Sequence, residues 1–140
     1  MVDPESVRRR LREIDRRLSA IRTIAAEGEE RFLSEDPLQT QAERHVQLAT
    51  QAAIDVAVHI VAEDSPRTPE DYGSSFIVLA EIGVIDRGLA EHLRAAAGLR
   101  NILVHGYLDV DPNQLWLHLG RSEDLTSFAS AVEAYLTRES

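Results

Sequence analysis

The chain has 140 residues, 15 basic and 24 acidic, and a formal net charge of −9 at pH 7. This length predicts one domain, residues 1–140, with one hydrophobic core, and an apolar content of 44% excludes a disordered chain. The absence of Cys excludes disulfides and cysteine-based zinc sites. The charged N-terminal segment and the lack of a long apolar run predict neither a signal peptide nor a membrane span, so we expect a soluble cytoplasmic protein.

Every basic residue is Arg, and the chain has no Lys. Genomic base composition is a sufficient cause of this bias. The chemical consequence is that any cationic site must use a guanidinium, whose planar fork suits carboxylates and phosphates.

The first half of the chain predicts two long helices. Residues 4–28 form an amphipathic pattern, with Asp3 as the N-cap and Pro4 in the first turn. The apolar residues alternate in steps of four and three, and the Arg and Glu residues between them are expected to form a solvated face. Glu29-Glu30 are expected to be solvated charges in a turn. A second helix runs from Asp36-Pro37 to about Glu63, and its wide apolar surface indicates a central position.

The second half predicts shorter helices. One spans about 70–82 and ends at Gly83 in a left-handed cap. The next is capped by Asp86 and frays near His105-Gly106, and the last runs from Asp111-Pro112 to Leu136 with a bend at Gly120. The predicted fold is an all-α, up-down bundle of four to five helices.

The segment 99–107 places several functional groups at the end of an apolar helix: Arg100, Asn101, His105 and Tyr107. On a continuous helix, Arg100 and His105 lie about 140° apart, but a helix end near Val104 and a turn at Gly106 would let them converge. Imidazole moves protons near neutral pH, and guanidinium holds phosphate and stabilises developing charge. The pair therefore suits phosphodiester chemistry.

The spacing alone also fits a structural role. A His near a helix C-terminus often contacts the terminal carbonyls, and a Tyr two residues later often packs over the helix end. The short pattern by itself leaves both interpretations open.

The whole string resembles the R-x-x-x-x-H-x-Y motif of HepT toxins, small helical ribonucleases of the HEPN superfamily. Arg100, His105 and Tyr107 stand at the motif positions, and Asn101 matches the polar residue after the Arg. The resemblance covers nearly the entire chain. It includes the charged first helix, Phe32-Leu33 before Asp36-Pro37, the helix over 47–62, Tyr72 with the stretch 79–85, and residues 109–111.

This resemblance implies a HEPN-like homodimer whose two motif segments face each other across a cleft. It implies endonucleolytic RNA cleavage with no metal or other cofactor. His105 would act as general base or acid on the ribose 2′-hydroxyl and the leaving oxygen, Arg100 would bind the scissile phosphate, and Asn101 would orient the site.

The resemblance also implies a type VII toxin–antitoxin module. Its partner would be an MntA-like nucleotidyltransferase antitoxin, bound in a complex of the homodimer or a larger hetero-oligomer. That antitoxin would silence the toxin by transferring AMP to Tyr107, because the added negative charge would repel an RNA backbone.

Two alternatives remain. The bundle fits a noncatalytic helical subunit that docks a nucleotidyltransferase, although the intact set of Arg100, His105 and Tyr107 favours the nuclease. Tyr107 also fits a packing residue that is never modified. The net charge of −9 predicts that RNA binding is weak, salt-sensitive and confined to a local groove lined by Arg.

The remaining polar candidates carry weaker signals. Asp55 and His59 are neighbours on one helix face, but a metal site would need further ligands, so a buried Asp–His hydrogen bond is expected. Trp116 is expected in the core or at a dimer interface. Solvated or capping roles are expected for His45, His92 and His118.

Overall fold

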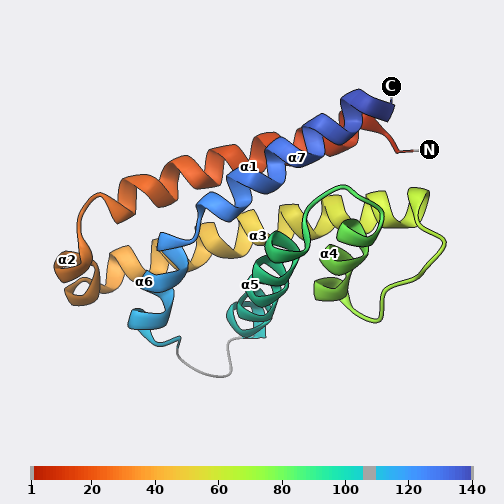
Figure 1. The fold of residues 1–140 in the computed structure, drawn as a ribbon. Helices are drawn as coiled ribbons and strands as arrows, with labels where there is room; N and C mark the ends of the chain where they lie inside the picture. Colours follow the sequence, from red (N-terminus) through yellow and green to blue (C-terminus); the bar gives the residue numbers. More distant parts are fainter. Residues whose placement is uncertain (1, 106–109, 140) are drawn as a thin grey trace.

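The computed structural model describes residues 2–105 and 110–139. Within these ranges the chain forms seven α-helices and no strand, which confirms the predicted all-α class (Figure 1). The helices are α1 (Pro4–Ala25), α2 (Glu29–Ser34), α3 (Asp36–Asp64), α4 (Tyr72–Glu81), α5 (Arg87–His105), α6 (Pro112–Gly120) and α7 (Glu123–Glu139). The number of helices exceeds the predicted four to five because a short additional helix, α2, follows the first predicted helix and because the last predicted helix is divided in two.

The additional helix follows α1. The helix begins as predicted, since the Asp3 carboxylate accepts hydrogen bonds from the backbone N–H groups of Glu5 at 3.1 Å and Ser6 at 3.3 Å. It ends at Ala25, before the predicted end, and Gly28 with a φ of +93° turns the chain into α2. Glu29 and Glu30 are therefore not turn charges. They lie in the first turn of α2, where acidic side chains favour the helix dipole.

The division of the last predicted helix separates α6 from α7. The carboxylate of Asp111 caps α6 by accepting from Asn113 N at 2.9 Å. The predicted bend at Gly120 is a full break, because α6 ends at this residue and α7 starts at Glu123. Gly83 has the predicted left-handed conformation, with a φ of +82°, and Asp86 caps the start of α5 by accepting from Leu89 N at 2.7 Å.

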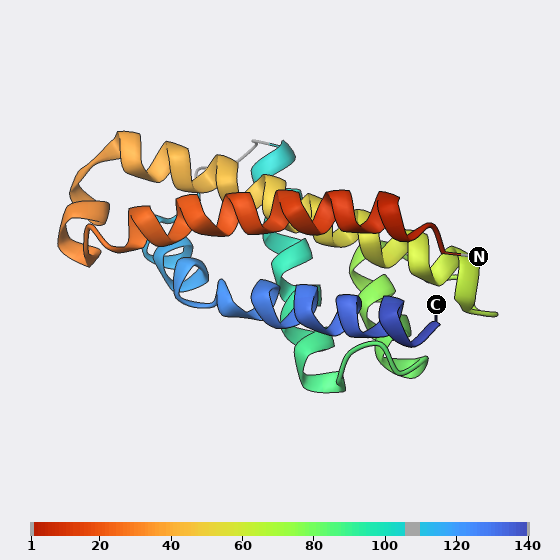
Figure 2. The ribbon, with the colours of Figure 1, turned by 90° about the horizontal axis from the view of Figure 1, so that it is seen from above.

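Helix α3 is central, as its wide apolar surface predicted, and it contacts each of the other six helices. α1 runs along α3 and α7 runs beside α1, whereas α5 crosses beneath α3 (Figures 1 and 2). In the view from above, the C-terminal end of α5 projects past α3 on the side away from α7 (Figure 2). This crossing places the motif segment at one side of the bundle.

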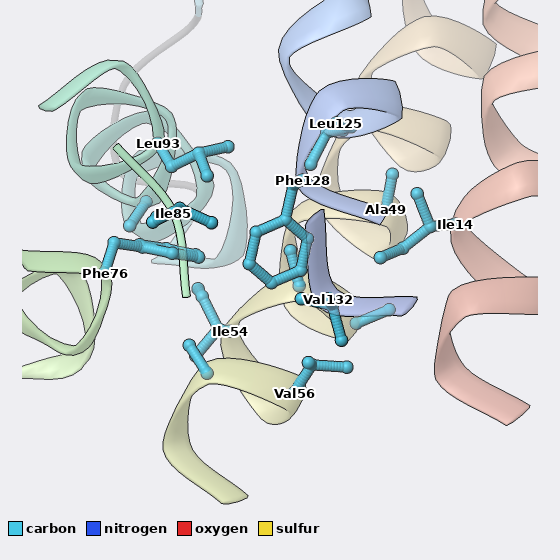
Figure 3. Packing of buried hydrophobic residues seen from close by; sticks show 14 of the residues in the cluster. Ile14, Ala49, Ile54, Val56, Phe76, Ile85, Leu93, Leu125, Phe128 and Val132 are labelled. Atoms are coloured by element: carbon cyan, nitrogen blue, oxygen red, sulfur yellow. The ribbon is translucent and has the colours of Figure 1, made fainter. Parts of the chain in front are cut away.

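The core draws buried residues from all seven described helices, and Figure 3 shows part of it. Phe76 and Phe128 meet edge to face, with ring centroids 5.7 Å apart. Ile14 and Val132 are fully buried beside them. Burying each large apolar side chain stabilises the fold by about 1.5–3 kcal/mol relative to exposure. Among the described residues, no helix has both the length and the apolar character needed to cross a membrane.

Candidate functional site

Arg100 lies near the C-terminal end of α5 and is half-buried. Its Nη1 donates a hydrogen bond to Oδ1 of Asn101 at 3.0 Å. Its Nε is buried and has no hydrogen-bond partner within the described part of the chain. A buried N–H without a partner is costly, so an acceptor supplied from outside this chain would stabilise the guanidinium.

No carboxylate among the described residues forms an ion pair with Arg100. Many arginines of this chain are held in ion pairs, for example Arg8 by Glu133 at 2.9 Å and Arg67 by Glu81 at 3.0 Å. Of the ion pairs within residues 2–105 and 110–139, none includes Arg100. The guanidinium is thus a full positive charge with an unused donor, which suits an anion such as a phosphate.

His105 is the last residue of α5 and its side chain is exposed. Because α5 is helical through His105, Arg100 and His105 lie on different flanks of one helix, about 140° apart. The helix thus ends at His105, close to the predicted end, and within it the two side chains leave on different flanks. Gly106 and Tyr107 lie outside the described residues.

Apolar side chains separate the polar motif residues. Ile102 is 49% exposed and Val104 is 40% exposed, although both lie on the last turns of α5. Exposed apolar groups beside an unpaired arginine are typical of a contact surface. The end of α5 therefore combines a site for an anion with a surface that another molecule would cover.

The expected hydrogen bond between Asp55 and His59 is wrong. Asp55 accepts from Nε2 of Gln51 at 2.8 Å and lies 3.8 Å from Nε of Arg10. The Nε2 of His59 accepts from the backbone N–H of Asp3 at 3.1 Å. Both residues are half-buried on α3, and each is engaged by the N-terminal part of the chain. The described residues contain no group of three or more His, Asp or Glu side chains placed to hold a metal ion.

Trp116, His45 and His92 each contact a side chain of another helix. The Trp116 ring packs against Phe32, with centroids 5.3 Å apart, so Trp116 contacts the core as expected. Nδ1 of His45 lies 3.2 Å from Nη1 of Arg17, and burial together with Arg17 lowers the pKa of His45. Nδ1 of the exposed His92 lies 3.5 Å from an Asp124 carboxylate oxygen.

Burial lowers the pKa of His118, and the neighbouring Arg121 lowers it further. The half-buried environment does not fit a solvated role, whereas the position of His118 in the last turn of α6 is compatible with the capping role that was the other expectation.

A model of the ribonuclease HepT-like family matches residues 14–134. The chain belongs to the ribonuclease HepT-like family. A tRNA nuclease HepT from Aphanizomenon flos-aquae is 34% identical over 136 residues, which cover 96% of this chain and 92% of the relative. An mRNA nuclease HepT from Shewanella oneidensis is 30% identical over 125 residues, covering 86% of this chain and 91% of the relative.

Solved structures of HEPN toxins share the fold. A tri-AMPylated Shewanella oneidensis HEPN toxin in complex with an MNT antitoxin superposes with a TM-score of 0.85 at 26% identity, covering 94% of this chain and 99% of that chain. The toxin–antitoxin crystal structure with AMP-PNP also gives 0.85, at 25% identity, covering 93% and 98%. The HepT-like family, the ribonuclease class and the HEPN fold predicted from the sequence are thus confirmed.

The arginines of α1 were predicted to form a solvated face, and Arg9, Arg12 and Arg16 are exposed. The sequence did not predict that several of these arginines line an open groove against α3. The sequence feature that could have indicated this groove is the positive charge of the helix, since α1 carries seven Arg and three acidic residues in an acidic chain.

Proposed function

We propose that this HepT-like chain is the toxin of a type VII toxin–antitoxin module and cleaves RNA endonucleolytically without a metal ion. The observation that carries the site assignment is Arg100, whose Nε is buried without a partner in the described chain and whose charge no described carboxylate balances. A phosphodiester supplies both the acceptor and the negative charge that this guanidinium needs. The relatives named as tRNA and mRNA nucleases support RNA as the substrate class.

His105 is the proposed proton-transfer group. Its imidazole takes the proton of a ribose 2′-hydroxyl, so that the 2′-oxygen attacks the neighbouring phosphorus. The bond to the 5′-oxygen then breaks, and that oxygen leaves with a proton from an imidazolium. Arg100 stabilises the extra negative charge on the phosphate oxygens in the transition state, and Asn101 holds the guanidinium in orientation.

The complete site is proposed to form in a homodimer. Within one chain Arg100 and His105 lie on different flanks of α5, so one helix does not direct both side chains at one phosphate. Pairing of two α5 ends about a twofold axis would bury Ile102 and Val104. Such an isologous contact repeats each residue across the cleft, so the arginine of one protomer can face the histidine of its partner.

A nucleotidyltransferase antitoxin is the proposed partner, and Tyr107 the proposed acceptor of AMP. The solved HEPN toxin that is tri-AMPylated and bound to an MNT antitoxin supports this modification. Each added phosphate would place negative charge two residues from His105, and that charge would repel the RNA backbone.

The nuclease proposal is tested by incubating RNA with the purified chain in EDTA. We expect cleavage by the natural chain, and a loss of rate of about 10²–10⁴-fold in His105→Ala, the usual contribution of a general acid–base group. His92→Ala is the matched control, because His92 is also exposed on α5. Equal cleavage by His105→Ala would refute the site assignment. An intact chain that leaves RNA uncut and is harmless when expressed alone would favour the noncatalytic docking subunit.

The modification is tested by intact-mass measurement after incubation with the antitoxin and ATP. We expect the mass to rise by one or more AMP units and the Tyr107→Phe variant to stay unmodified. Tyr72→Phe is the control, because Tyr72 is 57% exposed but lies on α4. Equal modification of Tyr107→Phe would place the acceptor elsewhere.

A further inference from the structure

Positive charge is concentrated on one helix of this acidic protein. α1 carries seven of the 15 Arg residues against three acidic residues, whereas the whole chain has a net charge of −9. An uneven distribution of this kind is the electrostatic pattern of nucleic-acid-binding surfaces.

The two flanks of α1 use their arginines differently. On the flank toward α7, Arg8 is held by Glu133 at 2.9 Å and Arg22 by Glu123 at 3.0 Å. On the other flank, Arg9, Arg10, Arg12 and Arg16 line an open groove of about 750 Å³ between α1 and α3. The first flank therefore holds the bundle together, and the second presents its charge to solvent.

The groove keeps an excess of positive charge. Its four arginines face the carboxylates of Glu13 and Asp55. Arg12 is also paired with Glu5 at 3.0 Å. Arg9 is exposed and forms no ion pair with any residue that the structure describes. Within the described ranges, the ion-pair partner of Arg16 is Glu13, which Arg16 shares with Arg17.

The α3 wall of the groove adds an unsatisfied polar group. Oε1 of Gln51 is buried without a hydrogen-bond partner in the described chain, while its Nε2 donates to Asp55. A ligand or water that donates a hydrogen bond, such as a ribose hydroxyl, would satisfy this oxygen.

Helix α3 lies between the groove and the proposed catalytic segment, because α1 runs above α3 and α5 passes beneath it (Figure 1). Helix α3 forms one wall of the groove, and α5 passes beneath α3 and emerges on the side away from α7 (Figure 2). A strand bound at the end of α5 would therefore pass around α3 to reach the groove along α1.

We propose that this α1–α3 groove binds the sugar–phosphate backbone of RNA and holds the part of the substrate beyond the nucleotides at Arg100. The inference rests on the proposed ribonuclease function and adds a second region of substrate contact. From Arg9 to Arg16 the helix rises about 10 Å, a length over which a strand at its helical spacing of about 3.4 Å carries about three phosphates. Guanidinium groups along the groove would bind these phosphates irrespective of base sequence.

The test measures the affinity of labelled single-stranded RNA by fluorescence anisotropy over a range of salt concentrations, in EDTA and in a His105→Ala background. The groove variant carries Arg9→Gln and Arg16→Gln. The matched control carries Arg31→Gln and Arg87→Gln, which change the net charge equally on α2 and at the start of α5. Thermal unfolding of each variant verifies the fold.

We expect the groove variant to bind RNA at least tenfold more weakly at low salt. The slope of log affinity against log salt should become shallower by about 1.4, because each phosphate contact to a single strand contributes about 0.7. The control should keep the slope of the parent. Glu13→Gln should tighten RNA binding, because it removes the carboxylate that pairs with Arg16. Its control, Glu91→Gln, should leave the affinity unchanged.

Equal losses in the groove and control variants would overturn the proposal, because they would show an effect of net charge alone. Absence of RNA binding by the parent would also overturn it, as would a groove variant that binds RNA as tightly as the parent. The proposed function fails separately, if gels show that the natural chain leaves RNA uncut or that His105→Ala still cuts it.

Discussion

Nη1 of Arg100 donates to Oδ1 of Asn101 across 3.0 Å, between consecutive residues of α5. A hydrogen bond between neighbours on a helix restricts the guanidinium to a few orientations. Because Nε is buried and the residue is half-buried, the arginine presents a limited edge to solvent. The Arg–Asn pair therefore resembles a pre-oriented anion site more than a flexible surface charge.

Two replacements of Arg100 should distinguish the effect of its positive charge from the effect of its planar guanidinium shape. We expect Arg100→Ala to lower the single-turnover rate of RNA cleavage by about 10²–10³-fold, the usual effect of losing a group that stabilises transition-state charge. Arg100→Lys should fall between this value and the natural chain, because Lys keeps the charge but lacks the planar fork. A Lys variant with the natural rate would contradict a role for the fork.

Asn101→Ala should have a smaller effect on the same rate, about fivefold, which corresponds to one hydrogen bond of about 1 kcal/mol. Asn101 is exposed, so the melting temperature should hardly change. A loss as large as that of Arg100→Ala would instead give Asn101 a direct contact with the substrate.

The hydroxyl of the buried Tyr135 on α7 donates to the carboxylate of Asp64 at the end of α3. Tyr135→Phe removes this bond, and we expect a loss of about 1 kcal/mol in the free energy of unfolding, since the exposed Asp64 regains water. Tyr72→Phe, at an exposed position, should have no measurable effect. Chemical denaturation at neutral pH checks both.

The same contact predicts a loss of stability in alkali. Burial, followed by the hydrogen bond to Asp64, raises the pKa of Tyr135 above its ordinary value of 10.0. A raised pKa in the folded state means that the stabilisation is complete below pH 10 and is lost as the pH rises above it. The Tyr135→Phe variant should lose less stability above pH 10 than the natural chain.

The lowered pKa of His118 predicts that the folded chain loses stability in mild acid. Its pKa is lowered from the ordinary value of 6.5, first by burial and then by Arg121. A lowered pKa means that the unfolded chain takes up a proton at higher pH than the folded chain, so stability falls as the pH drops below 6.5. His118→Gln should flatten the pH dependence of unfolding between pH 6.5 and the lowered pKa, and an unchanged profile would contradict the assignment.

Replacing Gly83 or Gly98 by alanine should change the stability of the fold in opposite directions. Gly83 has a φ of +82°, so Gly83→Ala strains the backbone and should destabilise the fold by about 1 kcal/mol. Gly98 lies within α5, and a Cβ there would meet no atom within 4 Å, so Gly98→Ala should stabilise by about 1 kcal/mol. Thermal unfolding compares the two, and the same sign in both would exclude this backbone explanation.

Local sequence signals predicted much of the fold because they act over a few residues. The caps at Asp3, Asp86 and Asp111, and the left-handed turn at Gly83, follow from side-chain chemistry within one helical turn. The interruption at Gly28 was predicted, but helix α2 after it was not, because two acidic residues after a glycine resemble a solvated turn. Only the structure shows that Phe32 of this segment is buried in the core.

The sequence by itself determined the helical class and the central position of α3, and its motif and surrounding pattern indicated the HepT-like family. Helical periodicity and a linear motif can both be recognised from the order of residues alone. Only the tertiary structure decided that Asp55 and His59 have different partners, that Arg100 keeps an unused donor, and that the α1 arginines divide between a flank bound to α7 and an open groove. These properties depend on which side chains meet across helices distant in sequence, and periodicity within one helix carries no information about that.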